Sequence, residues 1–274
     1  MEHIEGTTAI ITGASRGIGV YLARALAEEG VNLSLAARSE AELATVRTEI
    51  EALGVAAIAT VCDVTDPADR ARLIERTETE IGPVDILVNN AGIERIRRFE
   101  TAAEADFTDT LAVNLEAPIL LTRAVVPGML ERGRGHVVNI ASGAGKVGLP
   151  YSTSYCASKH GLVGFTHALR AEYERSPVGF SVVCPGFVTD AGMYDRWEAS
   201  GVKAPRIAGS SSPQKVASVA IACIRTDRAE ATVNTPPIRP LIVLANIAPS
   251  IVPFILRRFG YAETFEQVIA ANIE

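Results

Sequence analysis

The sequence has few of the residues that form metal centres and disulfide frameworks. Its 274 residues include four cysteines and four histidines, and neither kind recurs at a short, paired spacing. A disulfide framework or a zinc site requires such pairs, so we predict neither of them, and no other metal site. We expect the four cysteines to be small buried apolar residues, namely Cys62, Cys156, Cys184 and Cys223.

The chain also has no surplus of positive charge. Its 26 lysines and arginines are outnumbered by 32 acidic residues, which gives a net charge of -6. Because a nucleic-acid-binding protein must neutralise phosphates, we exclude nucleic acid as a partner. Residues 1–5 lack a basic region followed by an apolar run, so we expect a cytoplasmic protein without a signal peptide. With 48% hydrophobic residues, the composition is that of a soluble globular protein.

Short apolar runs alternate with amphipathic segments along most of the chain. We predict strands at 8–12, 32–36, 56–61, 84–89, 136–141 and 180–184. Predicted helices begin before Ile18, at a capping box of Ser39 and Glu42, at an N-cap formed by Asp66 before Pro67, and near Glu104. Such alternation produces a mostly parallel sheet covered by helices on both faces. No linker, repeat or low-complexity run interrupts it, so we predict one α/β domain over residues 1–274.

A glycine-rich turn follows the first predicted strand. Gly13, Gly17 and Gly19 lie between that strand and a predicted helix. Glycines let the backbone approach a pyrophosphate, and a helix N-terminus offers unpaired N–H groups. We therefore favour a nucleotide-binding loop over an ordinary turn. Ligands of such sheets bind beyond the carboxyl ends of the strands. The residues at those ends are Gly13, Ala37, Arg38, Asp63, residues 90–92, Ser142, Pro185 and Gly186.

Tyr155 and Lys159 are four residues apart in a predicted helix, so their side chains share one helix face. A nearby ammonium favours the ionised phenol, so we expect Tyr155 to exchange a proton nearer neutral pH than free tyrosine does. Ser142, at the end of the fifth predicted strand, adds a second hydroxyl. Taken alone, this short pattern also fits a half-buried tyrosine beside a solvated lysine.

Six motifs stand in the order and at about the spacing of one protein family. They are 12–19, 89–92, Asn114, Ser142, Tyr155 with Lys159, and Pro185 with Gly186. Over about residues 6–235 the chain therefore resembles the classical short-chain dehydrogenase/reductase (SDR) family. The resemblance implies a single-domain Rossmann-type doubly wound parallel sheet with helices on both faces. It also implies a nicotinamide cofactor and hydride transfer to or from a carbonyl or alcohol carbon.

The resemblance also implies roles for the matching residues. Tyr155 would be the general acid in reduction and the base in oxidation, and Lys159 would hold the nicotinamide ribose and favour the phenolate. Ser142 would polarise the substrate oxygen, and Asn114 would anchor a water in the proton relay. The residues expected to bind the cofactor are Gly13, Ser15, Arg16, Gly17, Ile18, Gly19, Arg38, Asp63, Val64, Asn90, Ala91, Gly92, Tyr155, Lys159, Pro185, Gly186, Val188 and Thr189.

The charge after the second predicted strand indicates which cofactor is preferred. Dinucleotide folds that choose NAD usually place a carboxylate there, which accepts from the ribose 2'-hydroxyl. Here the position holds Ala37 and Arg38, and Arg16 is a second cation in the glycine loop. Two guanidinium groups suit a 2'-phosphate, so we predict a preference for NADP(H). NAD(H) is the alternative, with Glu40 reaching the 2'-hydroxyl. Asp63 matches the family position at the adenine ring, or else caps its own loop.

The chain departs from the family pattern where the substrate should lie. The threonine expected to bond the nicotinamide amide stands one position early, at Thr189, and Asp190 occupies the usual place. We interpret residues 190–212 as a substrate lid over an apolar site, with an ordinary surface loop as the alternative. The charged residues 94–98 could meet an acidic group of the substrate, but we favour a solvated loop.

The end of the chain, residues 236–274, also differs from the family pattern. The usual glycine-rich closing strand is absent, and we predict a helical C-terminal extension. Its apolar run 241–256 is shorter than the roughly 20 residues that span a bilayer, so we predict no transmembrane helix. Three alternatives are open: a helix packed on the lid and pocket, a subunit interface of a homo-dimer or homo-tetramer, or a peripheral membrane contact with Arg257 and Arg258 near the headgroups.

Together these patterns predict an NADP-preferring oxidoreductase with Tyr155 as general acid and base. Its partner would be an apolar small-molecule ketone, aldehyde or secondary alcohol. A 3-oxoacyl thioester reductase of lipid metabolism is the alternative among enzymes. A non-catalytic dinucleotide-sensing protein is the alternative from another class, although such a protein would not require all four groups Asn114, Ser142, Tyr155 and Lys159.

Overall fold

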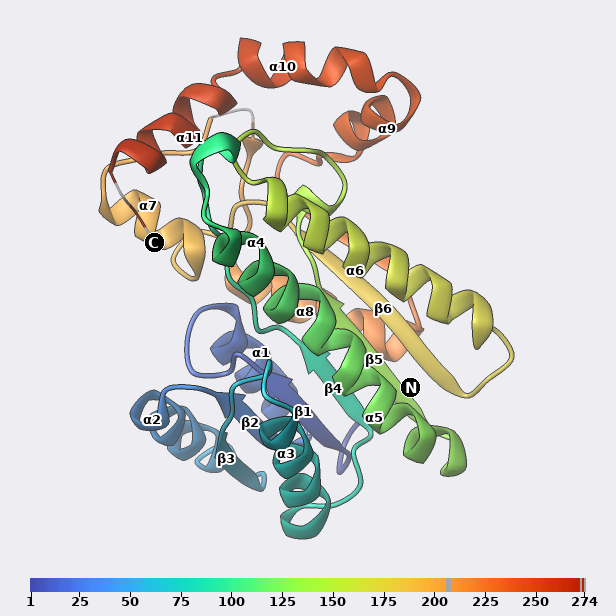
Figure 1. Cartoon of the computed structure of the whole chain (residues 1–274). Coiled ribbons are helices and arrows are strands. Elements are labelled where there is room, and N and C mark those ends of the chain that lie inside the picture. Colours follow the sequence, from blue (N-terminus) through green and yellow to red (C-terminus); the bar gives the residue numbers. More distant parts are fainter. Residues whose placement is uncertain (206–207, 272, 274) are drawn as a thin grey trace.

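The computed structural model describes residues 1–205, 208–271 and 273. Its centre is a seven-stranded parallel sheet with the strand order β3-β2-β1-β4-β5-β6-β7 (Figure 1). The strands are β1 (Thr8–Thr12), β2 (Asn32–Ala37), β3 (Ala57–Val61), β4 (Ile86–Asn89), β5 (Gly135–Ile140), β6 (Val178–Pro185) and β7 (Glu230–Val233). The predicted parallel α/β architecture is confirmed.

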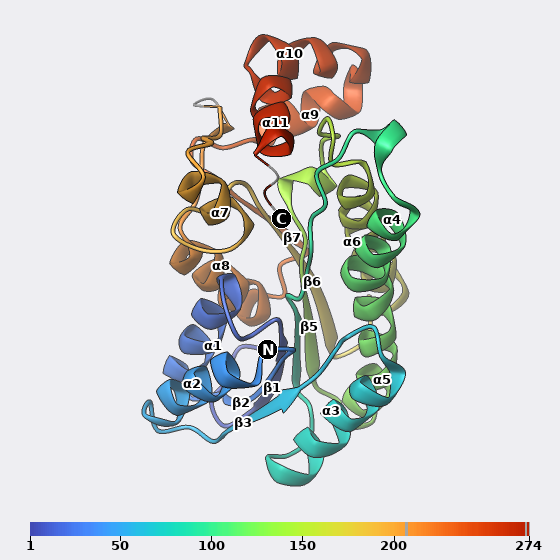
Figure 2. The same cartoon turned by 60° about the vertical axis from the view of Figure 1, so that its left-hand side comes forward.

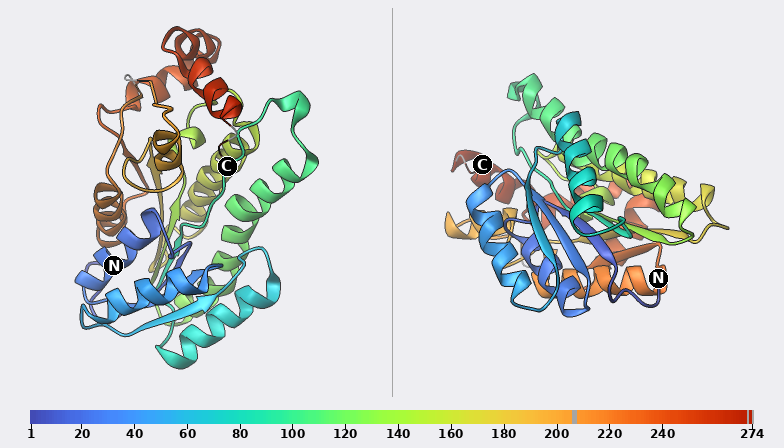
Figure 3. Two further views of the ribbon diagram at one scale, coloured as in Figure 1. Left: turned by 90° about the vertical axis from the view of Figure 1, so that its left-hand side faces the viewer. Right: turned by 90° about the horizontal axis from the view of Figure 1, so that it is seen from below.

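Helices cover both faces of this sheet, as Figures 2 and 3 show. One face is covered by α1 (Ile18–Glu28), α2 (Glu40–Glu51) and α8 (Pro213–Thr226), whose buried residues share one apolar cluster with the strands. The opposite face is covered by α3 (Pro67–Glu80), α5 (Ala117–Glu131) and α6 (Thr153–Glu172). The sheet is therefore doubly wound.

The two covered faces explain why the strands read as unbroken apolar runs. Side chains alternate between the faces, so Leu33 and Leu35 of β2 join one apolar cluster while Ala36 joins the other. All three are 0% exposed. A strand that is buried on both sides has no position for a solvated side chain, which is why its sequence lacks a polar alternation.

Two predictions about local structure are wrong. A closing strand does exist: β7 pairs with β6 from Val182 opposite Glu230 to Pro185 opposite Val233, without any glycine. Ser39 precedes α2, but its side chain makes no capping hydrogen bond, so the predicted capping box does not form. The predicted N-cap of α3 is confirmed, because Asp66 accepts from the backbone N–H groups of Ala68 and Asp69.

The remaining helices lie beyond the carboxyl ends of the strands. They are α7 (Met193–Ala199), α9 (Arg239–Ile247), α10 (Val252–Arg258) and α11 (Tyr261–Ala270). Figures 1 and 2 show α9, α10 and α11 as an outlying group at one end of the molecule. An apolar cluster that includes Trp197, Ile242, Leu256 and Phe265 joins α7 to this group.

One helical run of the described residues, Glu104–Glu131, has the length and hydropathy of a membrane span. It comprises α4 (Glu104–Leu111), a π-helical turn (Ala112–Glu116) and α5. However, 44% of its most apolar window is buried inside the fold, and α5 contributes Leu121 and Met129 to the core beneath the sheet. We therefore assign this run to the helical layer.

Candidate active site

A cleft of about 940 Å³ lies at the carboxyl ends of the strands. Residues that follow each of the seven strands line it, which is where a doubly wound sheet binds ligands. Most residues with a predicted role in the site line this cleft: Gly13, Ser15, Arg16, Gly17, Ile18, Arg38, Asp63, Val64, Asn90, Ala91, Gly92, Ser142, Tyr155, Pro185, Gly186 and Val188.

The glycine loop after β1 is held tightly against the loop after β4. Asn90 donates its side-chain amide to the carbonyls of Thr12 and Gly13 at 3.0 and 3.1 Å. Gly13 has φ +66°, and a Cβ added there would lie 2.9 Å from the Cα of Ala91. A Cβ at Gly19 would lie only 2.1 Å from the carbonyl oxygen of Gly13. The loop thus presents bare backbone to the cleft ahead of α1, which fits a dinucleotide pyrophosphate.

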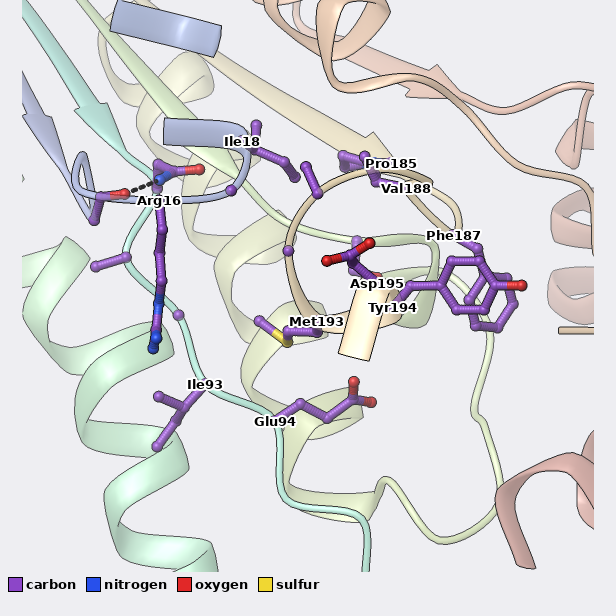
Figure 4. Close-up of a pocket in the computed structure, with 18 of the residues that line it drawn as sticks. Arg16, Ile18, Ile93, Glu94, Pro185, Phe187, Val188, Met193, Tyr194 and Asp195 are labelled. Carbon is purple, nitrogen blue, oxygen red and sulfur yellow. Dashed lines mark hydrogen bonds between the residues drawn. The ribbon is translucent and has the colours of Figure 1, made fainter. Parts of the chain in front are cut away.

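Basic side chains line the same end of the cleft. Arg16 extends from the glycine loop, and Figure 4 shows it with Ile93, Glu94 and Met193 around one opening. Arg38 follows β2 and faces Asp63, whose pKa is lowered first by hydrogen bonds from Thr65 and further by the charge of Arg38. Asp63 therefore both lines the cleft and holds its own loop. Arg38 gives the cleft beside Asp63 the charge that a phosphate requires. The Arg16 side chain instead reaches toward Ile93 in Figure 4, close enough to Arg196 for its charge to add to burial in lowering the pKa of that guanidinium.

Tyr155 and Ser142 meet in the middle of the cleft. Tyr155 is 8% exposed in the first turns of α6, and its hydroxyl is hydrogen-bonded to that of Ser142. Ser142 is itself held by the backbone N–H of Ala144 at 3.1 Å. Lys159 lies one turn further along α6, where its Nζ is 5.6 Å from the Tyr155 ring centroid and donates to the carbonyl of Ile140 at 3.0 Å. The structure thus brings all three predicted groups together.

Burial is the largest influence on the pKa values of Tyr155 and Lys159. It raises the pKa of Tyr155 well above the ordinary tyrosine value, the Glu94 carboxylate raises that pKa further, and the hydrogen bond from Ser142 lowers it. Burial also lowers the pKa of Lys159 to about 8. The expectation that Lys159 would bring the tyrosine pKa toward neutrality is therefore not met, because burial strongly disfavours the charged phenolate. Tyr155 holds its proton at neutral pH.

Asn114 lies beside this group without lining the cleft. It is 0% exposed in the π-helical turn before α5. Its side-chain amide accepts from the backbone N–H of Ile93 and donates to the carbonyl of the same residue, both at 2.8 Å, and it donates to Ser158 at 3.1 Å. A Cβ on Gly92 would meet both Asn114 and Lys159 within 3.6 Å. Asn114 therefore fixes the chain after β4 against α6.

Glu94 is a functional candidate that the sequence reasoning missed. The loop 94–98 is not a solvated charged loop, since Ile96 is 4% exposed and Glu94 lines the cleft. The Ser152 hydroxyl donates to the Glu94 carboxylate at 2.9 Å. Burial raises the pKa of Glu94 to about 7, and the charges of Arg196 and Lys159 oppose that rise. Its position two residues beyond the 89–92 motif was the available signal.

The other end of the cleft is apolar and lies under the outlying helices. Phe187 after β6 contacts Tyr194 and Trp197 of α7, with ring centroids 5.1 and 5.7 Å apart. Leu241, Leu256 and Tyr261 of α9, α10 and α11 line the same cleft. Phe187 and the residues of α9, α10 and α11, more than 50 positions later in the sequence, therefore form one apolar wall. No local sequence motif predicts this wall.

Three residues with predicted cofactor contacts do not line the cleft: Gly19, Lys159 and Thr189. Lys159 is buried behind Tyr155, at 3% exposure. Gly19 lies beneath the glycine loop. Thr189 donates its backbone N–H to the carbonyl of Ser211 at 3.1 Å, and the neighbouring Asp190, with φ +61°, lines the cleft in its place.

Comparison with known proteins agrees with this geometry. The family model described as short chain dehydrogenase matches residues 7–200. The ketoacyl reductase HetN of Nostoc sp. is 39% identical over 99% of this chain and 95% of its own length. A putative ketoacyl reductase of Streptomyces coelicolor is 43% identical over 69% of this chain and 73% of its own.

Solved structures show the same likeness. A variant of actinorhodin polyketide ketoreductase with NADPH superposes with a TM-score of 0.76 at 32% identity, covering 83% of this chain and 95% of its own. A metagenomic short-chain oxidoreductase in complex with NADP gives a TM-score of 0.72 at 32% identity, covering 85% of this chain and 97% of its own. With its doubly wound sheet, glycine loop and Ser142–Tyr155–Lys159 group, this chain belongs to the short-chain dehydrogenase family of oxidoreductases.

Proposed function

We propose that this chain is an NADP(H)-dependent reductase of a carbonyl group carried on an apolar substrate. One observation carries the proposal: a single cleft holds the glycine loop and Arg38 at one end, the Ser142 and Tyr155 hydroxyls in the middle, and an aromatic wall at the other end. The cofactor, the reacting carbonyl and the apolar remainder of the substrate each have a matching region. The two superposed structures are complexes with NADPH and NADP, which supports the same cofactor here.

Among carbonyl substrates, we favour a 3-ketoacyl group. HetN, a ketoacyl reductase by name, matches nearly the whole chain, including the outlying helices. The apolar wall formed by Phe187, Leu241 and Leu256 suits an acyl chain. Simple apolar ketones and aldehydes are the broader class from which this substrate would be drawn.

The residues of the cleft supply a proton and a position for the carbonyl oxygen, while the nicotinamide supplies hydride when it is bound. The Ser142 hydroxyl would donate a hydrogen bond to the substrate oxygen and hold it beside Tyr155. As hydride reaches the carbonyl carbon, the Tyr155 hydroxyl would donate its proton to that oxygen, and the alcohol forms. A raised tyrosine pKa suits this direction, because the proton is in place at neutral pH.

Lys159 and Asn114 would support the reaction without donating to the substrate oxygen. Lys159 has a pKa of about 8, so its ammonium can stabilise the phenolate that proton donation leaves and can return a proton to it. Asn114 holds the backbone of Ile93 and so keeps the wall of the cleft in place beside Lys159. A protein that only senses a dinucleotide would not require this set of groups.

The test is the rate of NADPH and NADH oxidation by the purified protein with apolar ketones, aldehydes and a 3-ketoacyl thioester. We expect NADPH to be consumed faster than NADH, and the thioester to give the highest kcat/KM. Tyr155→Phe should keep NADPH binding but lose about a hundredfold to ten-thousandfold in kcat, since the phenol supplies the proton.

Tyr173→Phe is the matched control, because Tyr173 follows α6 outside the cleft and packs its ring on Phe180. It should turn over as the unaltered chain does. Full activity of Tyr155→Phe would disprove the proton-donor role. Tight NADPH binding without consumption of the cofactor by any carbonyl compound would support the sensing alternative.

A further inference from the structure

The segment from Arg239 to Phe259, which we name the cap segment, exposes an unusual amount of apolar surface. Among the described residues nine large apolar side chains are exposed, and five of them lie in these 21 positions. They are Val243, Ile247, Ile251, Phe254 and Phe259. Ile247 is 78% exposed and Phe254 is 60% exposed. Such a concentration of exposed apolar side chains in one segment indicates a contact surface.

The cap segment is packed on the protein by its other side. Ile242, Val252 and Leu256 are between 5 and 8% exposed and belong to the apolar cluster that joins α7 to α11. The helices of the cap segment therefore carry apolar residues on two sides. The inner side is buried against the protein, and the outer side is exposed. The inner contacts already account for folding, so the outer apolar residues are left for a partner.

Charge distinguishes the cap segment from the rest of the molecule. No acidic residue occurs between Glu230 and Glu263, whereas Arg239, Arg257 and Arg258 lie in that interval. All three arginines are exposed. Within the described residues no ion pair joins Arg257 or Arg258 to an acidic side chain. A chain with a net charge of -6 thus carries a positively charged cap segment.

The geometry suits a flat surface better than a bilayer crossing. α9 and the helical stretch Pro249–Arg258 meet at an angle of 115°. Figures 1 and 2 show α9 and α10 at the extremity of the molecule, away from the helical layers of the sheet. A bent pair at an extremity can lie along an interface with its apolar residues among the acyl chains and its arginines among the headgroups.

We propose that the cap segment docks this protein on the surface of an anionic lipid bilayer. Ile247 and Phe254 supply apolar burial, and Arg257 and Arg258 supply attraction to acidic headgroups. A second copy of the chain fits the same surface less well, because a twofold contact would bring the arginines of both copies together without an acidic partner in the cap segment. A bilayer of acidic lipid meets both the apolar residues and the charge.

Vesicle co-sedimentation of the full chain tests the proposal. We expect binding to vesicles of phosphatidylcholine mixed with phosphatidylglycerol, weaker binding to pure phosphatidylcholine, and a loss of binding at high salt. Replacing both Ile247→Ser and Phe254→Ser should weaken binding to the mixed vesicles by about tenfold or more. Replacing both Arg257→Gln and Arg258→Gln should cost about fivefold per arginine on the mixed vesicles alone.

Matched controls lie elsewhere on the surface. Leu53→Ser removes a side chain that is 46% exposed at the end of α2, and Arg123→Gln removes an exposed cation of α5. Neither should alter vesicle binding. Because Ile247 and Phe254 do not line the cleft, circular dichroism and NADPH binding should show that the double variant remains folded.

Three outcomes would overturn the proposal. The first is that the full chain fails to bind mixed vesicles. The second is that the double variant Ile247→Ser and Phe254→Ser binds them as well as the unaltered chain does. The third is that size-exclusion chromatography with light scattering shows the double variant breaking an oligomer that the unaltered chain forms, in which case the surface is an interface between copies.

Docking would have a consequence for substrate supply, which rests on the proposed function. Leu241 and Leu256 of the same helices line the apolar end of the cleft, so a docked molecule would hold that end against the acyl region. A 3-ketoacyl substrate presented in mixed vesicles should then be reduced more slowly by the Ile247→Ser and Phe254→Ser variant, while a water-soluble carbonyl compound is reduced at the unaltered rate. Vesicle binding without any turnover would leave docking intact and refute only the reaction.

Discussion

Tyr155 is acted on by two neighbouring side chains with opposite effects on its pKa. The hydrogen bond with the Ser142 hydroxyl lowers the pKa of the phenol, whereas the Glu94 carboxylate opposes ionisation by charge repulsion. Burial adds to the effect of Glu94 and is the largest cause. Burial raises the pKa of Glu94 itself to about 7, so its charge develops near neutral pH. The protonation of Tyr155 should therefore depend on Glu94, although the two side chains share no hydrogen bond.

Glu94→Gln tests this dependence. Removing the carboxylate should lower the pKa of Tyr155, so the acid limb of the pH profile for alcohol oxidation, which reports formation of the phenolate base, should move to lower pH. The difference between the two profiles should vanish below about pH 7, where Glu94 in the unaltered chain is protonated. Glutamine still accepts a hydrogen bond from Ser152, so the loop should keep its place.

Glu104→Gln provides the control, because Glu104 is exposed at the start of α4 outside the cleft. Its pH profile should coincide with that of the unaltered chain. If the acid limb of Glu94→Gln coincides with those of the unaltered chain and of Glu104→Gln, the Glu94 charge does not affect the pKa of Tyr155.

The sequence alone was enough to predict the residues of the site that belong to compact motifs. Ser142, Tyr155 and Lys159 were predicted because a strand end and one helix turn fix their relation, and the structure brings them together. Glu94 was missed because its environment is built by Ser152 and by Arg196 of α7, which are distant in sequence. The pKa of Tyr155 was misjudged for the same reason, since desolvation is a property of the assembled cleft.

At the scale of elements, the two predicted N-caps behave differently. Asp66 accepts two backbone N–H groups at 2.7 and 3.1 Å, and Pro67 follows at the first helical position. Ser39 has the extended backbone of an N-cap but makes no capping bond, because Ser39 and Glu42 line the cleft beside Arg38. The sequence pattern for a capping box is the same whether its side chains face the helix end or a ligand.

Asp66→Ala should lower the free energy of unfolding by about 1 kcal/mol, because two N–H groups of α3 lose their partner. Ser39→Ala should lower it by much less, since no bond is lost. Urea unfolding followed by circular dichroism measures both, with equal m values for the three proteins. Equal losses in the two variants would mean that helix propensity, and not the capping bond, sets the cost.

β7 shows where strand prediction reached its limit. The segment Glu230–Val233 has only four residues, and its side chains alternate between half-buried and buried positions. As the last strand of the sheet it pairs with β6 alone, so it lacks the unbroken apolar run that identified the inner strands. A search for a glycine-rich closing strand therefore passed over it.

At the scale of the whole molecule, stability depends on a sheet whose interior also holds polar groups. His136 of β5 is 0% exposed. Its Nε2 lies 2.8 Å from the Ser181 hydroxyl, and that hydroxyl donates to the carbonyl of Arg228 at 2.6 Å. Ser181 therefore accepts from His136, which assigns the proton of the neutral ring to Nε2. The other ring nitrogen, Nδ1, has no hydrogen-bond partner among the described residues.

Protonation of His136 would place a second N–H, at Nδ1, in a buried position without an acceptor. Burial accordingly lowers the pKa of His136 to about 3, and the charge of Asp227 only partly opposes that shift. In the unfolded chain a histidine binds its proton below about pH 6.5. Unfolding therefore takes up a proton between these two values, and the protein should lose stability as the pH falls from about 6.5 toward 3, by up to about 1.4 kcal/mol per pH unit.

His136→Gln isolates this contribution. Glutamine can still donate to Ser181 but does not titrate, so its unfolding free energy, measured with urea at several pH values, should fall less steeply between about pH 6.5 and 4.5 than that of the unaltered chain. The raised pKa of Glu94 acts in the opposite direction over part of this window, because a carboxyl that binds its proton more tightly when folded adds stability at lower pH. Glu94 is present in both proteins, so its contribution cancels in the difference. His3→Gln removes an exposed histidine and should leave the slope unchanged. If His136→Gln has the slope of the unaltered chain, acid sensitivity arises elsewhere, and the buried ring of β5 is not the group that limits the folded state at low pH.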